Sequence, residues 1–560
     1  MQQEPVVLGI NRTQDASICL MRGAQLVWAI QKERLSRLKH HWGKLGDLRE
    51  LYRARLPGLD QPIDVLVECY SSDPEVEKLA TYEEEVAATL TLAPGCRRAR
   101  ISHHLAHAYS AFPPSPFRSA AVMIVDGQGS PASAFTEDWP GAAEAPADWR
   151  EVSSFYHADR ERVACIGKQL WNGDEQRLAG LGMFYFQLTQ ALFPGEGNEG
   201  KVMGLAPHGD PQVLGLPPLE VDGPRVTIPA RWREILRDRA RFAYQAGDSS
   251  RFAASAALAA AGQRAFEEAL LELAHWLHAQ TGAENLCFAG GTGLNCPANA
   301  RLLRATPFRR VFIPPAPGDA GTAIGCAAYG LSELAGLSCG WRWEHDYLGP
   351  EPSPAAIAAA CASDPTLIVE RIVDPAALCA RMVALLEAGE VIGLFQGGSE
   401  FGPRALGHRS ILGDPRRDGL RDWINARVKQ REWFRPLAPM VLLERAEAFF
   451  DLRAPSPFMQ YAAPVRAAAA PLIPAVTHVD GSARLQTVGQ RDDPLLRALL
   501  LAFEARTGVP VLLNTSFNRR DEPIVETPAE ALAAFRATPM QALAMPPFLL
   551  RKPPGAEDRA

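Results

Sequence analysis

Three short apolar runs, each ending at a loop of small or polar residues, organise the first half of the chain. They occupy residues 6–11, 121–130 and 286–295. An apolar run of this length, bounded by turn residues, predicts a buried β-strand followed by a loop. The recurrence of the pattern predicts a duplicated α/β fold.

A long alanine-rich stretch, residues 252–280, has the period of an amphipathic helix. Further along, residues 341–347 are followed by Leu-Gly-Pro-Glu-Pro-Ser-Pro, whose prolines cannot continue a helix. A chain of 560 residues is also too long for a single core. We therefore expect two domains, residues 1–347 and residues 348–560.

The composition excludes several classes of partner. The chain is 47% hydrophobic and 22% charged, which is ordinary for a soluble globular protein, and its formal charge of −6 gives no electrostatic reason to expect nucleic acid. The first residues lack a cationic segment followed by a long apolar one, and no apolar stretch is long enough to span a bilayer. The ten cysteines form no C-x-x-C pair. We expect a cytoplasmic protein with reduced thiols and no membrane partner.

Two histidines spaced i, i+4 offer the clearest candidate chemistry. His103 and His107 lie in Ser-His-His-Leu-Ala-His-Ala, and a helix would place both imidazoles on one face. Asp126 and Asp319 each follow an apolar run and lie in a glycine-containing loop. An isolated pair of histidines is more often a surface or core feature, because the HExxH context is absent. The two acids reverse that preference, since two imidazoles and two carboxylates suit Fe(II), Mn(II) or Zn(II).

The glycine pair at Gly290 and Gly291 follows one of the apolar runs. Glycines in such a loop let backbone N–H groups approach phosphate oxygens without a side chain in the way. A tight turn is the more usual meaning of a lone glycine pair. The loop is therefore a weak candidate for phosphate binding when taken alone.

Motifs in the second half combine cations, amides and hydroxyls with glycine and proline. They are the segments 400–410, 477–487 and 513–518, together with Asn425, Lys429, Arg431 and Arg435. Arginine supplies forked donors to phosphate, and hydroxyl and amide groups fill the remaining positions. A single arginine is commonly a solvated charge, but Gly-Pro-Arg-Ala-Leu-Gly is neither charge-patterned nor of low complexity. The mixture favours recognition of phosphate groups.

These motifs make the chain resemble, essentially end to end, the carbamoyltransferases typified by the nodulation, cephalosporin and tobramycin O-carbamoylating enzymes. The resemblance rests on Gly9-Ile-Asn, Asp15-Ala-Ser, Glu33-Arg34, Lys39-His40, the His103 and His107 motif, Asp126-Gly-Gln-Gly, Glu199-Gly-Lys-Val-Met-Gly-Leu-Ala206, Ala289-Gly-Gly, Asn295, Gly318-Asp-Ala-Gly, Phe401-Gly-Pro-Arg-Ala-Leu-Gly, Arg409-Ser, Lys429, Arg431-Glu-Trp-Phe-Arg-Pro, Thr477-His-Val-Asp-Gly and Asn514-Thr-Ser-Phe-Asn.

The resemblance implies an α/β protein with a division of labour. The N-terminal domain is expected to be a duplicated actin-like (ASKHA) domain, similar to the threonylcarbamoyl-adenosine tRNA enzymes, with a metal on the two histidines and two aspartates. The C-terminal domain is expected to be YrdC-like and to make a carbamoyl adenylate from carbamoyl phosphate and ATP. The first domain then delivers the carbamoyl group to an acceptor, away from bulk water.

From the resemblance we expect two groups of functional residues. Those expected to act in catalysis are Gln14, Asp15, His40, Arg404 and Lys429. Those expected to hold nucleotide or carbamoyl phosphate are Lys201, Gly290, Gly291, Asn295, Arg409, Arg435, Arg484, Asn514, Ser516 and Asn518. Lys201 has an alternative role as an ion-pair partner of Glu199. The implied cofactors are Fe(II) or another divalent transition metal and Mg-ATP, with carbamoyl phosphate as co-substrate.

The first loop departs from the family pattern. Gln14 stands where the family has histidine, and an amide has no useful basicity if that histidine takes a proton from the acceptor. Either His40 or Asp15 has taken the role of base, or the acceptor is a better nucleophile than an alkyl alcohol. Lys32 and Asp521 also depart from the pattern, because an acid and a glycine are typical there.

The leading expectation is an ATP-dependent carbamoyltransferase acting on a hydroxyl or amine of a small secondary-metabolite acceptor, as in antibiotic biosynthesis. A second is an actin-like ATPase or regulatory module that binds nucleotide without transfer. A third, carbamoylation of a tRNA nucleoside, is disfavoured by the net charge and the lack of a basic patch. The sequence leaves open the acceptor, the native metal and the oligomeric state, for which a homodimer is one candidate.

Overall fold

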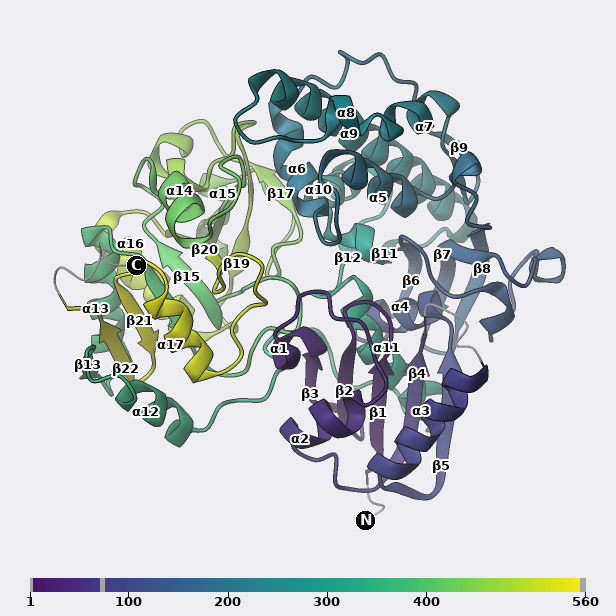
Figure 1. Ribbon diagram of the computed structural model, residues 1–560, viewed down its shortest axis with the longest axis horizontal. Coiled ribbons are helices and arrows are strands. Elements are labelled where there is room, and N and C mark those ends of the chain that lie inside the picture. Colours follow the sequence, from purple (N-terminus) through teal and green to yellow (C-terminus); the bar gives the residue numbers. More distant parts are fainter. Residues whose placement is uncertain (1–3, 71–75, 554–560) are drawn as a thin grey trace. The chain divides into compact units, whose positions relative to one another are not determined.

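A computed structural model describes residues 4–70 and 76–553 of the chain (Figure 1). The chain divides into two compact units. The first contains Met1–Ser36 and His40–Glu344, and the second contains Arg37–Lys39 and His345–Ala560. The division after Glu344 lies three residues before the position at which the proline-rich segment led us to place a boundary.

Two five-stranded sheets form the framework of the first unit. The first sheet has the order β3-β2-β1-β4-β5, and the second has the order β8-β7-β6-β11-β12. In both sheets the first two pairs are antiparallel and the last two are parallel. The strands are β1 (Val6–Asn11), β2 (Ser17–Arg22), β3 (Gln25–Gln31), β4 (Ile63–Cys69), β5 (Leu92–Ile101), β6 (Ser119–Val125), β7 (Arg150–Asp159), β8 (Val163–Trp171), β11 (Asn285–Ala289) and β12 (Arg310–Phe312). This repeated order confirms the predicted duplicated actin-like fold.

The central strands of both sheets are buried on both faces. All six residues of β1 are buried, as are six of the seven residues of β6. Strands that are covered on both faces read as continuous apolar runs rather than as alternating patterns. This is why the runs at 6–11, 121–130 and 286–295 were visible in the sequence.

Two helices connect the sheets through very close packing. α11 (Thr322–Tyr329) packs on β1, β2 and β4, whereas α4 (His103–Ala111) packs on β6, β7 and β11, and the two helices contact each other. A Cβ added at Gly325 would lie 1.8 Å from the Ala106 carbonyl oxygen, and one at Gly9 would lie 2.1 Å from the Ala323 carbonyl oxygen. Only glycine allows these backbones to approach so closely.

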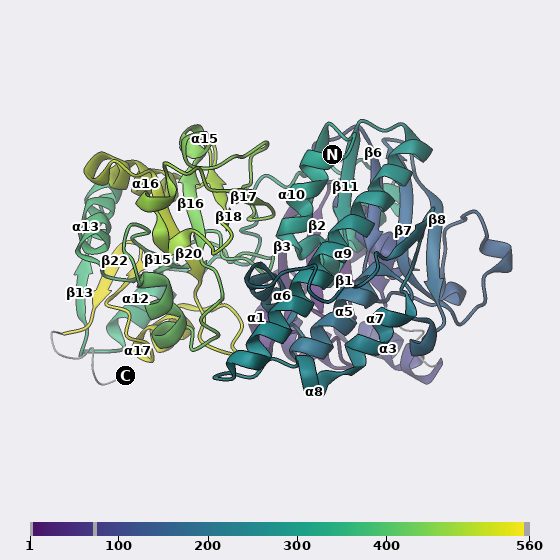
Figure 2. The same ribbon diagram turned by 90° about the horizontal axis from the view of Figure 1, so that it is seen from above.

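The predicted long helix is α9 (Ser249–Thr281), which contains the expected range 252–280. The Asp248 side chain caps its start by accepting hydrogen bonds from the N–H groups of Ser250 and Arg251. Gly282 ends it in the left-handed conformation, with φ of 59°. In Figure 2 this helix runs beside α5 (Leu181–Leu192), and the two pack against each other and on β6 and β7.

The remaining elements of the first unit are shorter. They are α1 (Lys32–Ser36), η1 (Leu48–Tyr52), α2 (Arg53–Arg55), α3 (Val76–Thr89), η2 (Ala132–Ala134), η3 (Ala142–Glu144), η4 (Glu175–Arg177), α6 (Glu199–Leu205), η5 (Ala206–His208), β9 (Glu220–Asp222), β10 (Arg225–Thr227), α7 (Ala230–Arg237), α8 (Arg239–Phe242), η6 (Gly291–Leu294), α10 (Cys296–Ala305), η7 (Asp319–Gly321) and η8 (Gly330–Leu334).

The second unit is built on an eight-stranded mixed sheet of order β13-β22-β21-β14-β15-β20-β16-β19. The strands are β13 (Ile368–Arg371), β22 (Phe548–Arg551), β21 (Ala542–Met545), β14 (Ile392–Phe395), β15 (Arg409–Gly413), β20 (Val511–Ser516), β16 (Ala438–Leu442) and β19 (Gln486–Val488). The sheet and its helices enclose one large apolar core. The unit is therefore α/β, as expected, and its YrdC-like character stays a prediction.

The other elements of the second unit lie around this sheet. They are α12 (Pro354–Ala362), α13 (Pro375–Ala388), α14 (Leu420–Trp423), η9 (Ile424–Val428), η10 (Leu443–Arg445), α15 (Ala446–Phe449), β17 (Ala462–Pro464), η11 (Ala470–Leu472), η12 (Pro474–Val476), β18 (Ser482–Arg484), α16 (Pro494–Thr507) and α17 (Pro528–Arg536). Residues 37–39 join this unit through Arg37, which donates to the Pro523 and Ile524 carbonyls at 2.9 and 2.8 Å.

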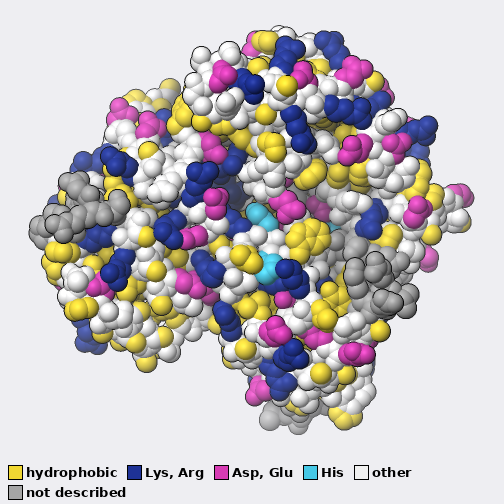
Figure 3. Space-filling model, in the orientation of Figure 1, with side chains coloured by type: hydrophobic (Ala, Val, Ile, Leu, Met, Phe, Trp, Pro, Cys, Tyr) yellow, Lys and Arg dark blue, Asp and Glu magenta, His cyan; other side chains and the backbone are white. Residues whose placement is uncertain are grey.

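Basic and acidic side chains are interspersed on the face of the molecule in Figure 3. Among the residues that the structure describes, every helix is too short or too polar to cross a lipid bilayer.

We predict that Gly325→Ala destabilises the first unit. The added methyl group would meet the Ala106 carbonyl and force α11 away from α4, and overpacking of this kind costs about 1–3 kcal/mol. Thermal unfolding should therefore occur at a lower temperature. Gly489→Ala is the matched control, because a Cβ there meets nothing closer than 3.4 Å. Equal unfolding temperatures for the two variants would contradict the packing argument.

Candidate metal and anion sites

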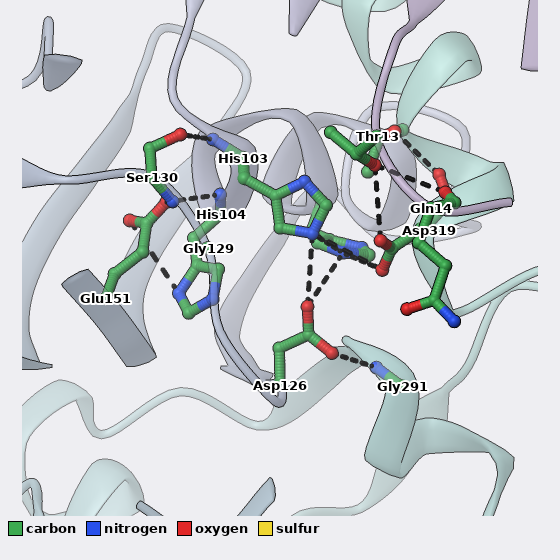
Figure 4. A network of polar contacts seen from close by, with 12 residues as sticks. Thr13, Gln14, His103, His104, Asp126, Gly129, Ser130, Glu151, Gly291 and Asp319 are labelled. Carbon is green, nitrogen blue, oxygen red and sulfur yellow. Dashed lines mark hydrogen bonds and ion pairs between the residues drawn. The ribbon is translucent and has the colours of Figure 1, made fainter. Parts of the chain in front are cut away.

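Four side chains from three segments converge in the first unit (Figure 4). α4 supplies His103 and His107, the end of β6 supplies Asp126, and η7 supplies Asp319. His103 Nε2 lies 3.1 Å from Asp126 Oδ2, 3.3 Å from Asp319 Oδ1 and 3.2 Å from His107 Nε2. His107 Nε2 lies 3.6 and 3.7 Å from the same two carboxylate oxygens. The structure thus brings together the four residues expected from the sequence.

The spacing of these donor atoms suits one divalent transition metal ion. A metal about 2.1 Å from each ligand atom places neighbouring ligand atoms about 3.0–3.4 Å apart, close to the separations observed. The two imidazoles are fully buried and Asp126 is nearly so, whereas the Asp319 side chain is 18% exposed. A buried set of two nitrogens and two oxygens is a donor set for Fe(II), Mn(II) or Zn(II). The residues present therefore fit the metal that the family resemblance implies.

The charges within the cluster strongly perturb the histidines and aspartates. Burial alone would lower the pKa of His103, but Asp319 and hydrogen bonds to both carboxylates raise that pKa well above its usual value. Burial would also lower the pKa of His107, and the same carboxylates raise it. Burial opposes ionisation of Asp126, yet its hydrogen bonds to the two histidines hold its pKa well below the usual range. Protons and a metal cation therefore compete for this site.

The first loop supports Asp319 directly. Thr13 Oγ1 donates to Asp319 Oδ2 at 3.2 Å, and Asn11 Nδ2 donates to the Asp319 carbonyl at 2.9 Å. Figure 4 shows the Gln14 side chain running beside Asp319. The expected catalytic position 14 therefore lies next to the metal cluster, although its amide cannot serve as a base.

Asp15 and His40 face each other near this loop. His40 Nδ1 lies 2.9 Å from Asp15 Oδ1, and the His40 N–H donates to Glu33 Oε2 at 3.2 Å. Burial raises the pKa of Asp15, against the lowering effect of His40. Gly197 lies against the other imidazole nitrogen, because a Cβ added there would come within 2.2 Å of His40 Nε2. The two candidate bases of this region are thus paired with each other.

The loop at Gly290 and Gly291 forms a turn and also contacts the metal cluster. The N–H of Gly291 donates to Asp126 Oδ1 at 2.8 Å. Gly290 has φ of 95°, and a Cβ there would lie 2.2 Å from the Val125 carbonyl oxygen. Asn295 caps α10 by accepting from the Ala298 N–H and exchanges hydrogen bonds with Gln263, and its expected role in nucleotide binding stays a prediction.

Lys201 lies in α6, and its ammonium is 5.8 Å from the centre of the Phe193 ring. This separation is within the range of a cation–π contact. Its role in nucleotide binding stays a prediction.

Lys429 lies at the centre of a cationic cluster in the second unit. Its ammonium donates to the Ser516 carbonyl and hydroxyl at 2.7 and 3.0 Å, and to the Asn518 carbonyl and side-chain oxygens at 3.0 and 2.6 Å. All four acceptors are uncharged: two backbone carbonyls, one hydroxyl and one amide oxygen. Burial, followed by Arg431, Lys39 and Arg435, lowers the pKa of Lys429 well below its usual value.

Three arginines share this environment. Burial, together with Arg435 and Arg484, lowers the pKa of Arg431 well below its usual value. Burial lowers the pKa of Arg435 too, although Glu432 opposes the shift from 3.5 Å. Cations that repel one another in a buried place are stabilised when an anion binds among them. The cluster formed by Lys429, Arg431, Arg435 and Arg484, called the cation cluster below, is therefore a candidate anion site.

The motif at 400–410 folds around Glu400. Its carboxylate accepts hydrogen bonds from the N–H groups of Leu406, His408 and Arg409 at 2.7, 2.9 and 3.3 Å. Arg404 is half-buried in this loop. Its catalytic role stays a prediction.

Arg409 and Asn514 make hydrogen bonds within the second unit, and the ligand-binding role expected of each stays a prediction. The Arg409 guanidinium is fully buried, lies 3.7 Å from the centre of the Phe395 ring and donates to the carbonyls of residues 396, 397, 408 and 526. Asn514 Nδ2 donates to the Ala405 carbonyl and to Gln486. Nη1 and Nη2 of Arg409 and Nδ2 of Asn514 thus donate to protein oxygens, which helps to hold the 400–410 loop.

The structure shows the surroundings of Lys32 and Asp521, the two other positions that depart from the family pattern. Lys32 is buried, and its ammonium contacts Asp47 Oδ1 at 2.8 Å and the Trp42 carbonyl at 2.7 Å. Asp521 has φ of 58°, a conformation that favours glycine, which is typical at this position in the family. Lys32 thus has a partner of its own, whereas Asp521 occupies a strained backbone position.

A buried pair of charges, Glu151 and Lys168, lies next to the start of α4 and was not identified from the sequence. Glu151 and Lys168 have fully buried side chains that lie 2.6 Å apart. Each belongs to a strand, and a charged residue in a strand is usually solvent-facing. The only sequence signal is that Lys168 stands within the largely apolar run 163–171.

Most of the chain matches known protein families. Residues 99–328 match the family described as Carbamoyltransferase N-terminus, and residues 383–552 match the family described as Carbamoyltransferase C-terminus. Nodulation protein NolNO of Sinorhizobium fredii is 34% identical over 576 residues, covering 96% of this chain and 79% of that protein. Nodulation protein NolO of Bradyrhizobium diazoefficiens is 37% identical over 475 residues, covering 81% of this chain and 80% of that protein.

The chain belongs to the carbamoyltransferase family, which confirms the resemblance drawn from its motifs. Its class of activity is therefore the transfer of carbamoyl groups. Among solved structures, full-length HypF in its phosphate- and nucleotide-bound form has a TM-score of 0.36 and 12% identity, covering 61% of this chain and 57% of that chain. That similarity is too low to carry an argument about the site.

We predict that the metal affinity of the first unit rises with pH. The raised pKa values of His103 and His107 mean that protons hold these nitrogens near neutral pH, so metal binding must displace them. The aspartates are already ionised and release none. Titration with Co(II) between about pH 6 and about pH 8 should show tighter binding and proton release. A flat profile, or proton uptake, would contradict this assignment.

Proposed function

We propose that this carbamoyltransferase uses ATP to activate carbamoyl phosphate as carbamoyl adenylate, and then transfers the carbamoyl group to a small acceptor. The observation that carries the proposal is the cation cluster of the second unit, which is chemically separate from the metal cluster of the first. One site suits polyanionic substrates, and the other suits a Lewis-acidic metal. Two sites of such different chemistry fit a two-step reaction.

The first step takes place at the cation cluster. Carbamoyl phosphate, ATP and water give carbamoyl adenylate, pyrophosphate and phosphate, so every reactant and product other than water carries phosphate oxygens. The four oxygen atoms that accept from Lys429 are uncharged, so an anion bound here would be the partner that stabilises the ammonium form. Arg431 and Arg435 add fixed positive charge to the same place. Preorganised cations of this kind stabilise the negative charge that develops during phosphoryl chemistry.

The second step takes place at the metal cluster. The acceptor hydroxyl or amine attacks the carbamoyl carbon, AMP leaves, and one proton is lost from the acceptor. His103, His107, Asp126 and Asp319 would hold the metal, with Thr13 and Asn11 keeping Asp319 in place. A bound divalent metal would supply Lewis acidity toward a carbonyl or phosphoryl oxygen of the adenylate.

The proton released by the acceptor goes to the pair formed by His40 and Asp15. When Nδ1 carries the imidazole proton, it donates a hydrogen bond to Asp15 Oδ1, and Nε2 is then the unprotonated nitrogen. A carboxylate that orients a histidine in this way stabilises the imidazolium formed after proton transfer. The pair therefore supplies the basic group that Gln14 cannot.

We predict that variants separate the two steps. His103→Ala should abolish transfer to the acceptor and leave carbamoyl-dependent release of pyrophosphate near the wild-type rate. Lys429→Ala should slow pyrophosphate release by about 10–150-fold without changing metal content, because a charge-assisted hydrogen bond worth about 1.5–3 kcal/mol is lost. Pyrophosphate release and carbamoylated product are measured by enzymatic coupling and by mass spectrometry with candidate acceptors.

Two outcomes of this experiment would overturn the proposal. Loss of both steps in a folded His103→Ala variant would show that the reactions share one site. Release of ADP independent of carbamoyl phosphate would show that the chain is an ATPase rather than an adenylate-forming transferase.

We predict that His40→Ala and Asp15→Asn each lower the rate of carbamoyl transfer by about 10²-fold, the usual contribution of a general base, and leave adenylation unchanged. His41→Gln is the control, because His41 lies on the same segment and contacts Ser36. Mild effects from both variants would mean that the acceptor needs no base. A strong effect confined to Gln14→Ala would show that the amide itself positions substrate.

A further inference from the structure

The start of α4 presents backbone N–H groups that a helix cannot satisfy internally. Three such groups have well-defined acceptors. The N–H of His103 donates to Ser130 Oγ at 2.9 Å, that of His104 donates to Glu151 Oε1 at 2.9 Å, and that of Leu105 donates to Ser102 Oγ at 3.4 Å. Two of these acceptors come from segments remote in sequence, so the start of the helix is fixed by tertiary structure.

Glu151 is the centre of this arrangement (Figure 4). Its Oε1 also accepts from the Ser130 N–H at 3.2 Å, and its backbone exchanges hydrogen bonds with the 129–130 segment. Ser130 in turn donates its hydroxyl to the Tyr70 carbonyl at 2.6 Å. One carboxylate therefore fixes both the start of α4 and the loop that follows Asp126.

A buried lysine holds Glu151 in place from the opposite side. Lys168 Nζ lies 2.6 Å from Glu151 Oε2 and 2.8 Å from Glu137 Oε1. It also donates to Ser154 Oγ at 3.1 Å, and its side chain is fully buried. Glu137 accepts a hydrogen bond from the hydroxyl of Ser102 at 3.1 Å. Ser102 is the N-cap residue of α4, so Lys168 is linked to the start of this helix through Glu137 as well as through Glu151.

The loop packs closely against Glu151 and His104 at Gly129. A Cβ added at Gly129 would lie 2.7 Å from Glu151 Cγ and 2.9 Å from His104 Cδ2. Gly129 is thus required by the contact between the loop and Glu151. Gly127, by contrast, meets nothing within 4 Å.

We propose that Lys168, Glu151, Glu137 and Ser130 form a positioning network for the metal centre. None of the four belongs to the group of four candidate ligands, yet together they fix the backbone from which His103 and His107 project and the loop that follows Asp126. The inference rests on the proposed function, because it assumes that these ligands bind metal.

A role in stability alone does not account for the network. Burying an ammonium and two carboxylates carries a large desolvation penalty, and apolar replacements of similar volume are often neutral or stabilising. Directional contacts supply what apolar packing cannot, namely a fixed position for each N–H group at the start of α4. Supporting residues of this kind typically change metal affinity about 10–100-fold when they are removed.

The test measures Co(II) affinity and the visible spectrum of bound Co(II), which reports the arrangement of its ligands, together with thermal unfolding. The variants are Ser130→Ala, its conservative counterpart Ser130→Thr, and the double variant Glu151→Met/Lys168→Met, which removes both charges at similar volume. Ser153→Ala is the matched control. Ser153 is a buried serine on β7 whose hydroxyl has no hydrogen-bond partner among the residues that the structure describes.

We expect Ser130→Ala and the double variant to raise the Kd for Co(II) by about 10–100-fold and to alter its spectrum. Ser130→Thr should restore affinity, and Ser153→Ala should leave it unchanged. A folded Ser130→Ala protein with wild-type affinity and spectrum overturns the inference, even if its unfolding temperature falls. If the double variant does not fold, Ser130→Ala and Ser130→Thr decide the question. Failure of the wild-type protein to bind Co(II) would instead overturn the metal centre itself.

Discussion

The close packing of α4 against α11 is the constraint on which the first unit depends. Each helix lies on one of the two sheets, and Gly325 lets the two backbones approach so closely that a single methyl group would overlap the Ala106 carbonyl. Asp319 immediately precedes α11, and both histidines lie on α4. The distance between these helices therefore sets the distance between ligands that are more than two hundred residues apart in the chain. Overpacking at this contact would act on stability and on metal geometry together.

The two units differ in the partners of their buried charged side chains. In the first unit, carboxylates surround the histidines and Lys168, so that each charge faces an opposite one. In the second, Lys429 contacts uncharged oxygen atoms and lies near Arg431 and Arg435. A buried cation without a carboxylate is costly unless a ligand supplies the negative charge. The first arrangement suits binding of a cation, and the second suits binding of an anion.

Much of the fold and the metal cluster could be predicted from the sequence, because their signals are local. Apolar runs marked the central strands, the i, i+4 spacing marked His103 and His107, and glycine loops marked Asp126 and Asp319. The contacts of the residues that the resemblance assigns to nucleotide or carbamoyl phosphate could not be predicted in the same way. Arg409 donates to backbone carbonyls and Asn295 caps a helix, contacts that no local pattern indicates, and the ligand-binding role of each stays a prediction. A side chain that donates hydrogen bonds can serve a ligand or the protein itself, and only its neighbours decide which.

The sequence by itself determined the class of fold, the candidate ligands and the family, because periodicity, spacing and motifs are properties of contiguous residues. Only the tertiary structure decided that Glu151 and Lys168 lie beneath the metal cluster, that Gly291 donates to Asp126, and that Asp15 faces His40. These contacts join segments from different strands and loops. Their existence depends on how two sheets and two helices pack, and that packing is a property of the whole unit rather than of any stretch of sequence.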